Sequence, residues 1–179
     1  MSVSTDGILT FGVDLGEEPE DLPWQAQTDL YDDDDEDEED IGFEEWLYIT
    51  MGVSSATLWN EYYEWARGWK TGDYAHDNEG VKAYEKLHPE WRVKLDKSYE
   101  EQHKVEKECP IELITHCSGE YPMYIVALRG HTTKAWRGSP EVIESLNVDE
   151  RLLSEAKIFC NKYGIPFDDP KWLLASYWG

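Results

Sequence analysis

The first 66 residues of the chain contain no lysine or arginine. They hold 20 of the 39 acidic residues and none of the 16 basic ones, so they carry 20 of the 23 net negative charges. Negative charge concentrated in this way is typical either of a segment that keeps the protein in solution or of a surface that competes for a basic partner. The charge therefore constrains the organisation of the chain more than any other sequence feature.

Nine consecutive carboxylates form the centre of this charge. They are Asp32, Asp33, Asp34, Asp35, Glu36, Asp37, Glu38, Glu39 and Asp40. An extended backbone advances roughly 3.3 to 3.6 Å per residue, close to the roughly 3.4 Å between phosphates along one DNA strand. The run can therefore imitate nucleic acid in the groove of a basic protein. The alternatives are a solvating linker and a metal site, but the run lacks the glycine that a calcium-binding EF-hand loop requires.

The composition excludes several classes of partner and site. With a pI near 4.4, the chain should be repelled by nucleic acids and by anionic membranes, which are both polyanions. No apolar run is long enough for a membrane span. The three cysteines, Cys109, Cys117 and Cys160, indicate unreactive thiols in a reducing cytoplasm. No glycine-rich phosphate loop is present, so no cofactor is expected.

Hydrophobic periodicity predicts a single α+β domain over residues 1–179, with a mostly antiparallel sheet of about three to five strands covered by helices. The expected strands are residues 8–14, 111–115, 123–128 and 133–137, and the apolar tail 172–178 is expected either to add a last strand or to dock across the core. The expected helices are 55–69, 78–87, 90–105 and 149–163, of which the first and last should pack on the sheet. Residues 17–45 are expected to form an acidic low-complexity loop, and 71–108 a polar helical insertion.

Local signals refine two of these elements. Asn147 with Glu150 resembles a capping box that opens the last helix, and Gly164 is expected to end it. Trp59, Trp65 and Trp69 lie at helical spacing, which favours core packing over a sugar-binding role. Trp24 and Trp46 flank the acidic run, and we expect them to supply specificity at a partner surface if they become ordered on binding.

The sequence offers one weak nucleophilic candidate, Cys117, next to His116. Neighbouring residues on a strand point to opposite faces, so His116 is not expected to act as the base for this thiol. The histidines that the fold would have to supply instead are His76, His88, His103 and His131. A zinc site at Cys109, His116, Cys117 and His131 matches no compact zinc spacing. A packed cysteine is therefore the favoured interpretation.

Three segments carry a resemblance to known proteins. They are Ser4–Gly16 with its STDGIL, FG and DLG motifs, His116–Ile125 with HCS and EYPMYI, and the tryptophan-rich end from Trp172. They resemble a group of small, uncharacterised proteins encoded by bacteriophages. The resemblance implies a phage accessory protein in the cytoplasm of a bacterial host, and it carries no catalytic residue over to this chain.

We therefore expect a non-enzymatic phage protein that binds a basic host protein through Asp32–Asp40. Nucleases, restriction or CRISPR components and transcription factors are the candidate partners, since each has a surface for nucleic acid. The alternatives are a structural or assembly protein of the virion, and a cysteine-dependent enzyme centred on Cys117. The sequence indicates no oligomeric state.

Overall fold

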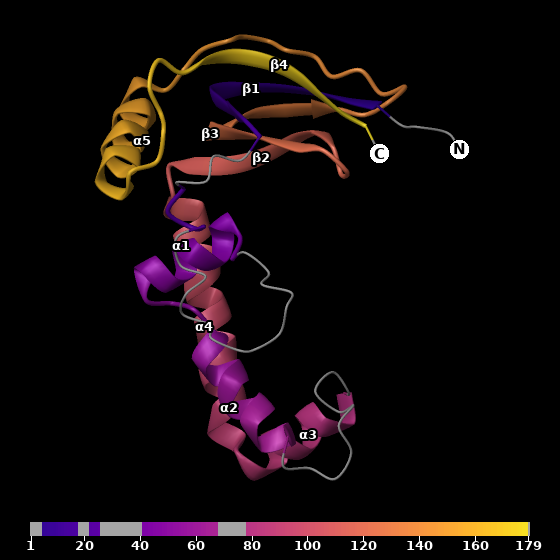
Figure 1. Ribbon diagram of the computed structural model, residues 1–179, viewed down its shortest axis with the longest axis vertical. Helices are drawn as coiled ribbons and strands as arrows, with labels where there is room; N and C mark the ends of the chain where they lie inside the picture. Colours follow the sequence, from indigo (N-terminus) through magenta and orange to yellow (C-terminus); the bar gives the residue numbers. More distant parts are fainter. Residues whose placement is uncertain (1–4, 18–21, 26–40, 68–77, 179) are drawn as a thin grey trace. The chain divides into compact units, whose positions relative to one another are not determined.

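The computed structural model describes residues 5–17, 22–25, 41–67 and 78–178 (Figure 1). By packing, the chain divides into two compact units, one formed by Met1–Phe43 with Cys109–Gly179 and the other by Glu44–Glu108. The first unit contains a sheet and one helix, and the second is helical. Each unit is described separately below.

The first unit is built from four strands and the helix α5. The strands are β1 (Thr5–Gly16), β2 (Ile111–Ser118), β3 (Pro122–Ala135) and β4 (Lys171–Trp178), and the helix is α5 (Glu150–Tyr163). Figure 1 shows the strands as one strongly curved sheet with α5 at one end of it. The predicted α+β class is confirmed, and the chain from Lys171 adds a strand to the sheet as expected.

The sheet closes into a small barrel with the strand order β1-β3-β2-β4. β1 pairs antiparallel with β3 on one edge and with β4 on the other, and β2 forms an antiparallel hairpin with β3. β2 and β4 are parallel, and their pairing within these described strands is limited to Cys117 with Tyr177 and Ser118 with Trp178. The predicted, mostly antiparallel sheet is therefore confirmed.

One face of the sheet holds a small apolar cluster of Ile8, Ile114, Ile125 and Ala127. Thr10 is fully buried, and its hydroxyl lies 2.7 Å from that of its cross-strand partner Thr132. The Thr132 hydroxyl in turn donates to Glu112 Oε1 at 2.8 Å. The buried hydroxyls are thus hydrogen-bonded, which avoids the cost of burying them unpaired.

The expected separate strand at residues 133–137 is wrong. β3 continues from Pro122 to Ala135, and it pairs with β1 both before and after Gly130. Gly130 has a φ of 73°, and the β1–β3 register shifts between Thr10 and Gly12. The glycine therefore marks an irregularity within one long strand rather than a chain reversal.

The expected capping box at Asn147 is also wrong, because α5 is capped by Asp149. The Asp149 side chain accepts hydrogen bonds from the backbone N–H groups of Arg151 and Leu152 at 2.9 and 3.1 Å. The Leu152 bond contributes most to lowering the pKa of Asp149. The predicted end is confirmed, since Gly164 is left-handed with a φ of 71°.

The second unit consists of α1 (Phe43–Met51), α2 (Ala56–Arg67), α3 (Asn78–Leu87) and α4 (Pro89–Glu108). α2, α3 and α4 were predicted, and Pro89 stands at the first position of α4, where proline is favoured. α1 was not predicted, and its start at Phe43 shortens the expected acidic loop. Tyr48 of α1 donates a hydrogen bond to Glu106 of α4, and burial together with this carboxylate raises the pKa of Tyr48.

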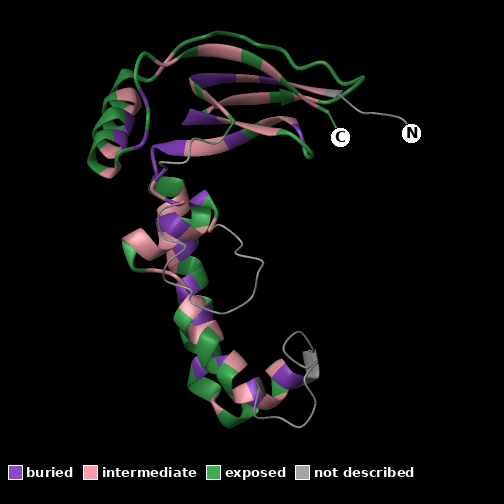
Figure 2. Cartoon of the chain, viewed as in Figure 1, coloured by how far each residue is buried: buried purple, intermediate pink, exposed green. Residues whose placement is uncertain are grey.

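An aromatic cluster forms the core of the helical unit. Tyr62, Tyr84 and Trp91 are buried, with ring centroids 5.2 to 5.9 Å apart, and Trp91 Nε1 donates to the Leu58 carbonyl at 2.8 Å. Within the helical unit, α2 thus packs against α3 and α4. Figure 2 shows how buried residues alternate with exposed ones along these helices.

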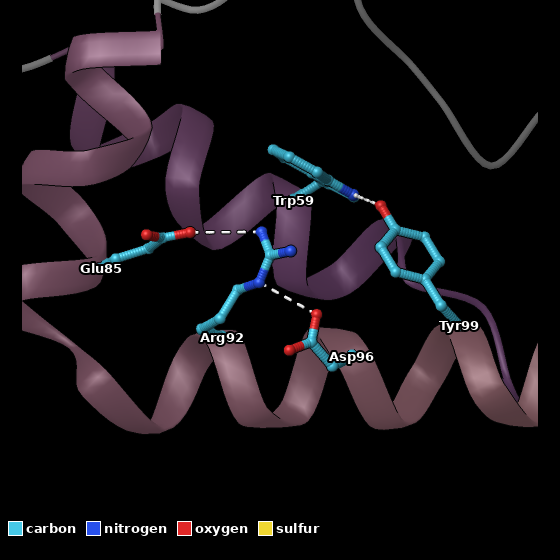
Figure 3. A network of polar contacts seen from close by, with 5 residues as sticks. All are labelled: Trp59, Glu85, Arg92, Asp96 and Tyr99. Carbon is cyan, nitrogen blue, oxygen red and sulfur yellow. Dashed lines mark hydrogen bonds and ion pairs between the residues drawn. The ribbon is translucent and has the colours of Figure 1, made fainter.

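Figure 3 shows polar contacts between side chains of α2, α3 and α4. Arg92 on α4 joins Glu85 of α3, at 3.3 Å, to Asp96 one turn further along α4, at 2.9 Å. Trp59 Nε1 donates to the Tyr99 hydroxyl at 3.1 Å. These pairs are solvent-exposed and contribute little to stability compared with the buried rings.

At Gly12, the backbone of β3 leaves no room for a side chain on β1. A Cβ atom at this position would clash with the Val126 carbonyl oxygen and would lie 2.8 Å from Ala127 Cα. We predict that Gly12→Ala lowers the free energy of unfolding by about 3 kcal/mol, because both obstacles are backbone atoms. At Gly7 the nearest atom would be 3.9 Å away, so Gly7→Ala should change stability by less than about 1 kcal/mol. Urea denaturation of both variants tests this, and equal losses would contradict it.

Trp91 is the second position at which stability should concentrate. Trp91→Ala is expected to cost about 3 to 5 kcal/mol, because it empties the aromatic cluster and removes the donor to Leu58. The neighbouring Arg92→Ala removes only exposed ion pairs and should cost less than about 1 kcal/mol. Thermal unfolding followed by circular dichroism compares the two, and a larger loss for Arg92→Ala would refute this ranking.

Candidate functional site

The sheet unit contains a cleft of about 590 Å³ that all four strands border. Its wall includes Asp14 of β1, His116 and Cys117 of β2, Met123 and Ile125 of β3, and Trp178 of β4. The cleft lies where β2 and β4 come together, at the end of the barrel that the pairs Cys117–Tyr177 and Ser118–Trp178 close. It is the candidate site because chemically reactive side chains meet there beside apolar ones.

His116 and Asp14 form the polar centre of the cleft. His116 Nε2 lies 3.4 Å from Asp14 Oδ1. The His116 side chain is 12% exposed and that of Asp14 is 51% exposed, so the pair joins a nearly buried imidazole to a solvated carboxylate. Asp14 Oδ1 also accepts a hydrogen bond from the Gly16 backbone N–H at 2.9 Å, which fixes the orientation of the carboxylate.

Cys117 departs from regular strand geometry. Its φ is 73°, in the left-handed region that L residues other than glycine, asparagine and aspartate rarely adopt. The alternation of side chains along β2 is therefore interrupted at this residue, and His116 and Cys117 border the same cleft. The expectation that the two side chains point to opposite faces applies to regular strand geometry, and the backbone of Cys117 does not have that geometry.

The other two cysteines are buried away from this chemistry. Burial raises the pKa of Cys160 to about 12, and it also raises the pKa of Cys109, although Arg129 opposes the shift there. Both thiols therefore stay protonated at neutral pH. All three cysteines are free, and Cys117 is the most exposed of them.

The structure does not bring the zinc candidates together. His131 Nε2 accepts from the Asp149 backbone N–H at 3.2 Å, and its Nδ1 lies 3.0 Å from the Arg129 carbonyl oxygen. Among the described residues, no group of three histidine, cysteine or acidic side chains is placed to hold a metal ion.

The acidic run Asp32–Asp40 lies outside the described residues, but the chain on either side of it is described. Leu22 and Trp24 before the run and Phe43 after it are buried. The Trp24 and Phe43 rings meet edge to face, with centroids 5.2 Å apart. The two ends of the acidic segment are therefore held next to each other within the sheet unit.

Trp24 and Trp46 are each 2% exposed. Trp24 packs on Phe43 in the sheet unit, and Trp46 lies in α1 of the helical unit. Both indoles are therefore part of the packing of their units as described, and neither presents a face to the surface.

Sequence reasoning did not find Asp14 as a site residue. It lies 102 positions from His116, and only the pairing of β1 with β3 and of β3 with β2 brings the two together. No local spacing could have revealed this contact.

The comparisons with known proteins give no relative for this chain. No family model, no curated protein and no solved structure matches it. Over the described parts of the chain, no helix combines the length and apolar character that a membrane crossing needs.

The unusual backbone of Cys117 has a measurable cost. We predict that Cys117→Gly raises the free energy of unfolding by about 0.5 to 1 kcal/mol, because glycine adopts a positive φ without steric penalty. Thr115→Gly, two residues earlier on β2, is the matched control and should lower it by a similar amount. Chemical denaturation measures both variants. If Cys117→Gly destabilises as much as the control, the backbone at Cys117 is not strained.

Proposed function

We propose that this protein acts by binding a basic protein partner through Asp32–Asp40. The observation that carries the proposal is the placement of charge, with 20 of 23 net negative charges in residues 1–66. Such a field speeds the encounter with cationic surfaces, and it does so most strongly at low salt. The binding itself requires no chemistry.

The chemistry of the run favours a nucleic-acid-binding protein as the partner. Its carboxylates recur at nearly the spacing of phosphates along a DNA strand when the backbone is extended. A groove that is lined with lysine and arginine to bind phosphates therefore also suits this segment. Occupying that groove would inhibit the partner as a nucleic-acid mimic.

The anchoring of the segment supports this role. Because the Trp24–Phe43 contact holds together the described chain before and after the acidic run, the run is attached to a folded unit at both of its ends. A loop with fixed ends has fewer conformations to lose on binding than a free tail. Trp24 thus serves as a support of the loop, and direct contact of Trp24 or Trp46 with a partner would require each indole to leave its buried position.

The resemblance to bacteriophage proteins suggests the setting. In the cytoplasm of an infected bacterium, a nuclease, a restriction or CRISPR component or a transcription factor offers a suitable basic groove. An accessory protein that blocks such a groove fits both the charge and the resemblance.

Two variants that lose the same number of negative charges, but from different parts of the chain, test the proposal. One variant removes five charges from the run, and the control removes five exposed charges elsewhere. The first carries Asp33→Asn, Asp35→Asn, Glu36→Gln, Glu38→Gln and Glu39→Gln. The control carries Glu100→Gln, Glu120→Gln, Glu141→Gln, Glu144→Gln and Asp168→Asn. Each immobilised protein is exposed to nuclease-treated bacterial lysate at about 0.05 M and about 0.3 M salt, and the captured proteins are quantified.

We expect the wild type and the control to retain the same basic nucleic-acid-binding proteins, and the run variant to retain about tenfold less of them. Once the nuclease has been washed away, labelled duplex DNA added to the immobilised wild type should displace these proteins from it. Equal retention by the two five-charge variants, or captured proteins that DNA does not displace, would contradict the proposal.

A further inference from the structure

We propose that the free edge of β4 binds an extended peptide segment of a basic protein, in which apolar residues alternate with lysine or arginine. The segment adds a strand to the barrel beside the cleft. This surface uses no residue of the acidic run, so it goes beyond the binding role proposed above. It rests on an unpaired strand edge, the apolar cleft that borders this edge and the negative charge around it.

β4 is paired along its whole length on one side only. Every residue from Lys171 to Trp178 has a partner on β1. On the other side, the pairing of β4 with described strands is limited to Tyr177 and Trp178. Alternate residues of a strand direct their backbone N–H and C=O groups to the same edge, so residues 171–176 present a row of groups that no described strand pairs. Such an edge is a template for one more strand.

β4 lacks the features that protect an edge strand from pairing. Natural edge strands are commonly blocked by charged side chains, prolines or bulges. β4 reads KWLLASYW, so Lys171 at its first position is its only charged residue, and its pairing with β1 runs without a register shift. Leu174 in the middle of the strand is 83% exposed, and Trp178 at its end is 43% exposed. An unblocked apolar edge in such a highly charged chain favours a role in strand pairing.

The cleft follows this edge and offers apolar contacts to an added segment. Residues 173–176 of β4 border it, together with Met123 and Ile125 of β3. At about 3.3 Å per residue, these four β4 residues span about 13 Å, the length over which four residues of an added strand pair. The apolar side chains of that strand then contact Leu173, Met123 and Ile125. Backbone pairing thus supplies affinity, and the cleft selects apolar residues at alternate positions.

Charge complementarity selects a cationic segment. Asp14 borders the cleft, and its side chain is 51% exposed. With a net charge of -23, the chain as a whole attracts cationic partners. The same charge opposes a second copy of this chain, because each copy brings its own excess of negative charge to the interface. Lysine or arginine at the remaining alternate positions of the segment therefore matches the surroundings of the edge better than neutral or acidic residues do.

A labelled hexapeptide of sequence KVKVKV is the probe, and fluorescence polarisation measures its binding to the full-length protein. The measurement is made at about 0.3 M salt, which screens contacts between the peptide and the acidic run. We expect a dissociation constant of about 0.1 mM or lower. The peptide EVEVEV, which the protein repels, should bind at least about tenfold more weakly. The same holds for KVKVKV with every backbone nitrogen methylated, because it cannot donate backbone hydrogen bonds to the edge.

Leu174→Lys places a cation in the middle of the edge and should weaken the binding of KVKVKV about tenfold. Ile158→Lys is the matched control, because it adds the same charge on α5 at a side chain that is 68% exposed. This control should bind the peptide as the wild type does. Asp14→Asn should weaken the binding of KVKVKV but not that of the neutral peptide TVTVTV, a difference that a merely structural role of Asp14 would not produce.

Hydrogen exchange locates the bound peptide. KVKVKV should slow the exchange of backbone amides in β4 and leave those of α5 unchanged. The variant of the acidic run that lacks five charges should bind KVKVKV as the wild type does, which separates this surface from the function proposed for the run.

The proposal is overturned if Leu174→Lys binds as well as Ile158→Lys, if methylation of the peptide has no effect, or if the run variant loses binding. Protection that falls outside β4 also overturns it. A dimer found by light scattering that Leu174→Lys dissociates would assign the edge to a second copy of the chain, and it would overturn the proposal as well.

Discussion

The two-sided pairing of β1 is the interaction on which the sheet unit depends. β1 pairs with β3 along one edge and with β4 along the other, so its backbone groups from Gly7 to Gly12 are used in both directions. The close approach at Gly12 lets β1 follow the curvature of β3 without a side chain in the way. Without this strand, β4 would keep only its short contact with β2, and the barrel would be open.

The same strand determines where the functional features lie. Its pairing with β3, together with the pairing of β3 with β2, brings the Asp14 carboxylate to His116. The chain then leaves β1 at Gly16 toward the acidic segment, whose ends meet at Trp24 and Phe43. One strand therefore both borders the cleft and leads toward the acidic run.

Much of the secondary structure could be predicted from local patterns, because the patterns report directly on local physics. The bounds of α3 follow from helical periodicity. The end of α5 at Gly164 follows from the need for a positive φ at that position, and the β2–β3 hairpin follows from its two apolar strands. Errors arose where two local signals competed. Asp149 displaced Asn147 as the cap, although both residues are good caps.

The site itself could not be predicted, because its geometry is long-range. The contact between Asp14 and His116 depends on strand order and register, which no single segment encodes. The strand alternation rule holds only for extended backbone, which Cys117 does not have, and nothing in the local sequence indicates a positive φ for a cysteine. Likewise, Gly130 suggested a turn, but the structure uses it within a continuous strand.

Native-state hydrogen exchange measured by mass spectrometry tests the central role of β1 most directly. If β1 is paired on both edges, the amides of peptides covering Ile8–Val13 should exchange only through global unfolding. They should exchange more slowly than the amides of peptides covering Lys171–Trp178, because β4 has only one long paired edge. Exchange of the β1 amides that is as fast as that of the β4 amides would contradict the account, because the barrel would then not depend on its N-terminal strand.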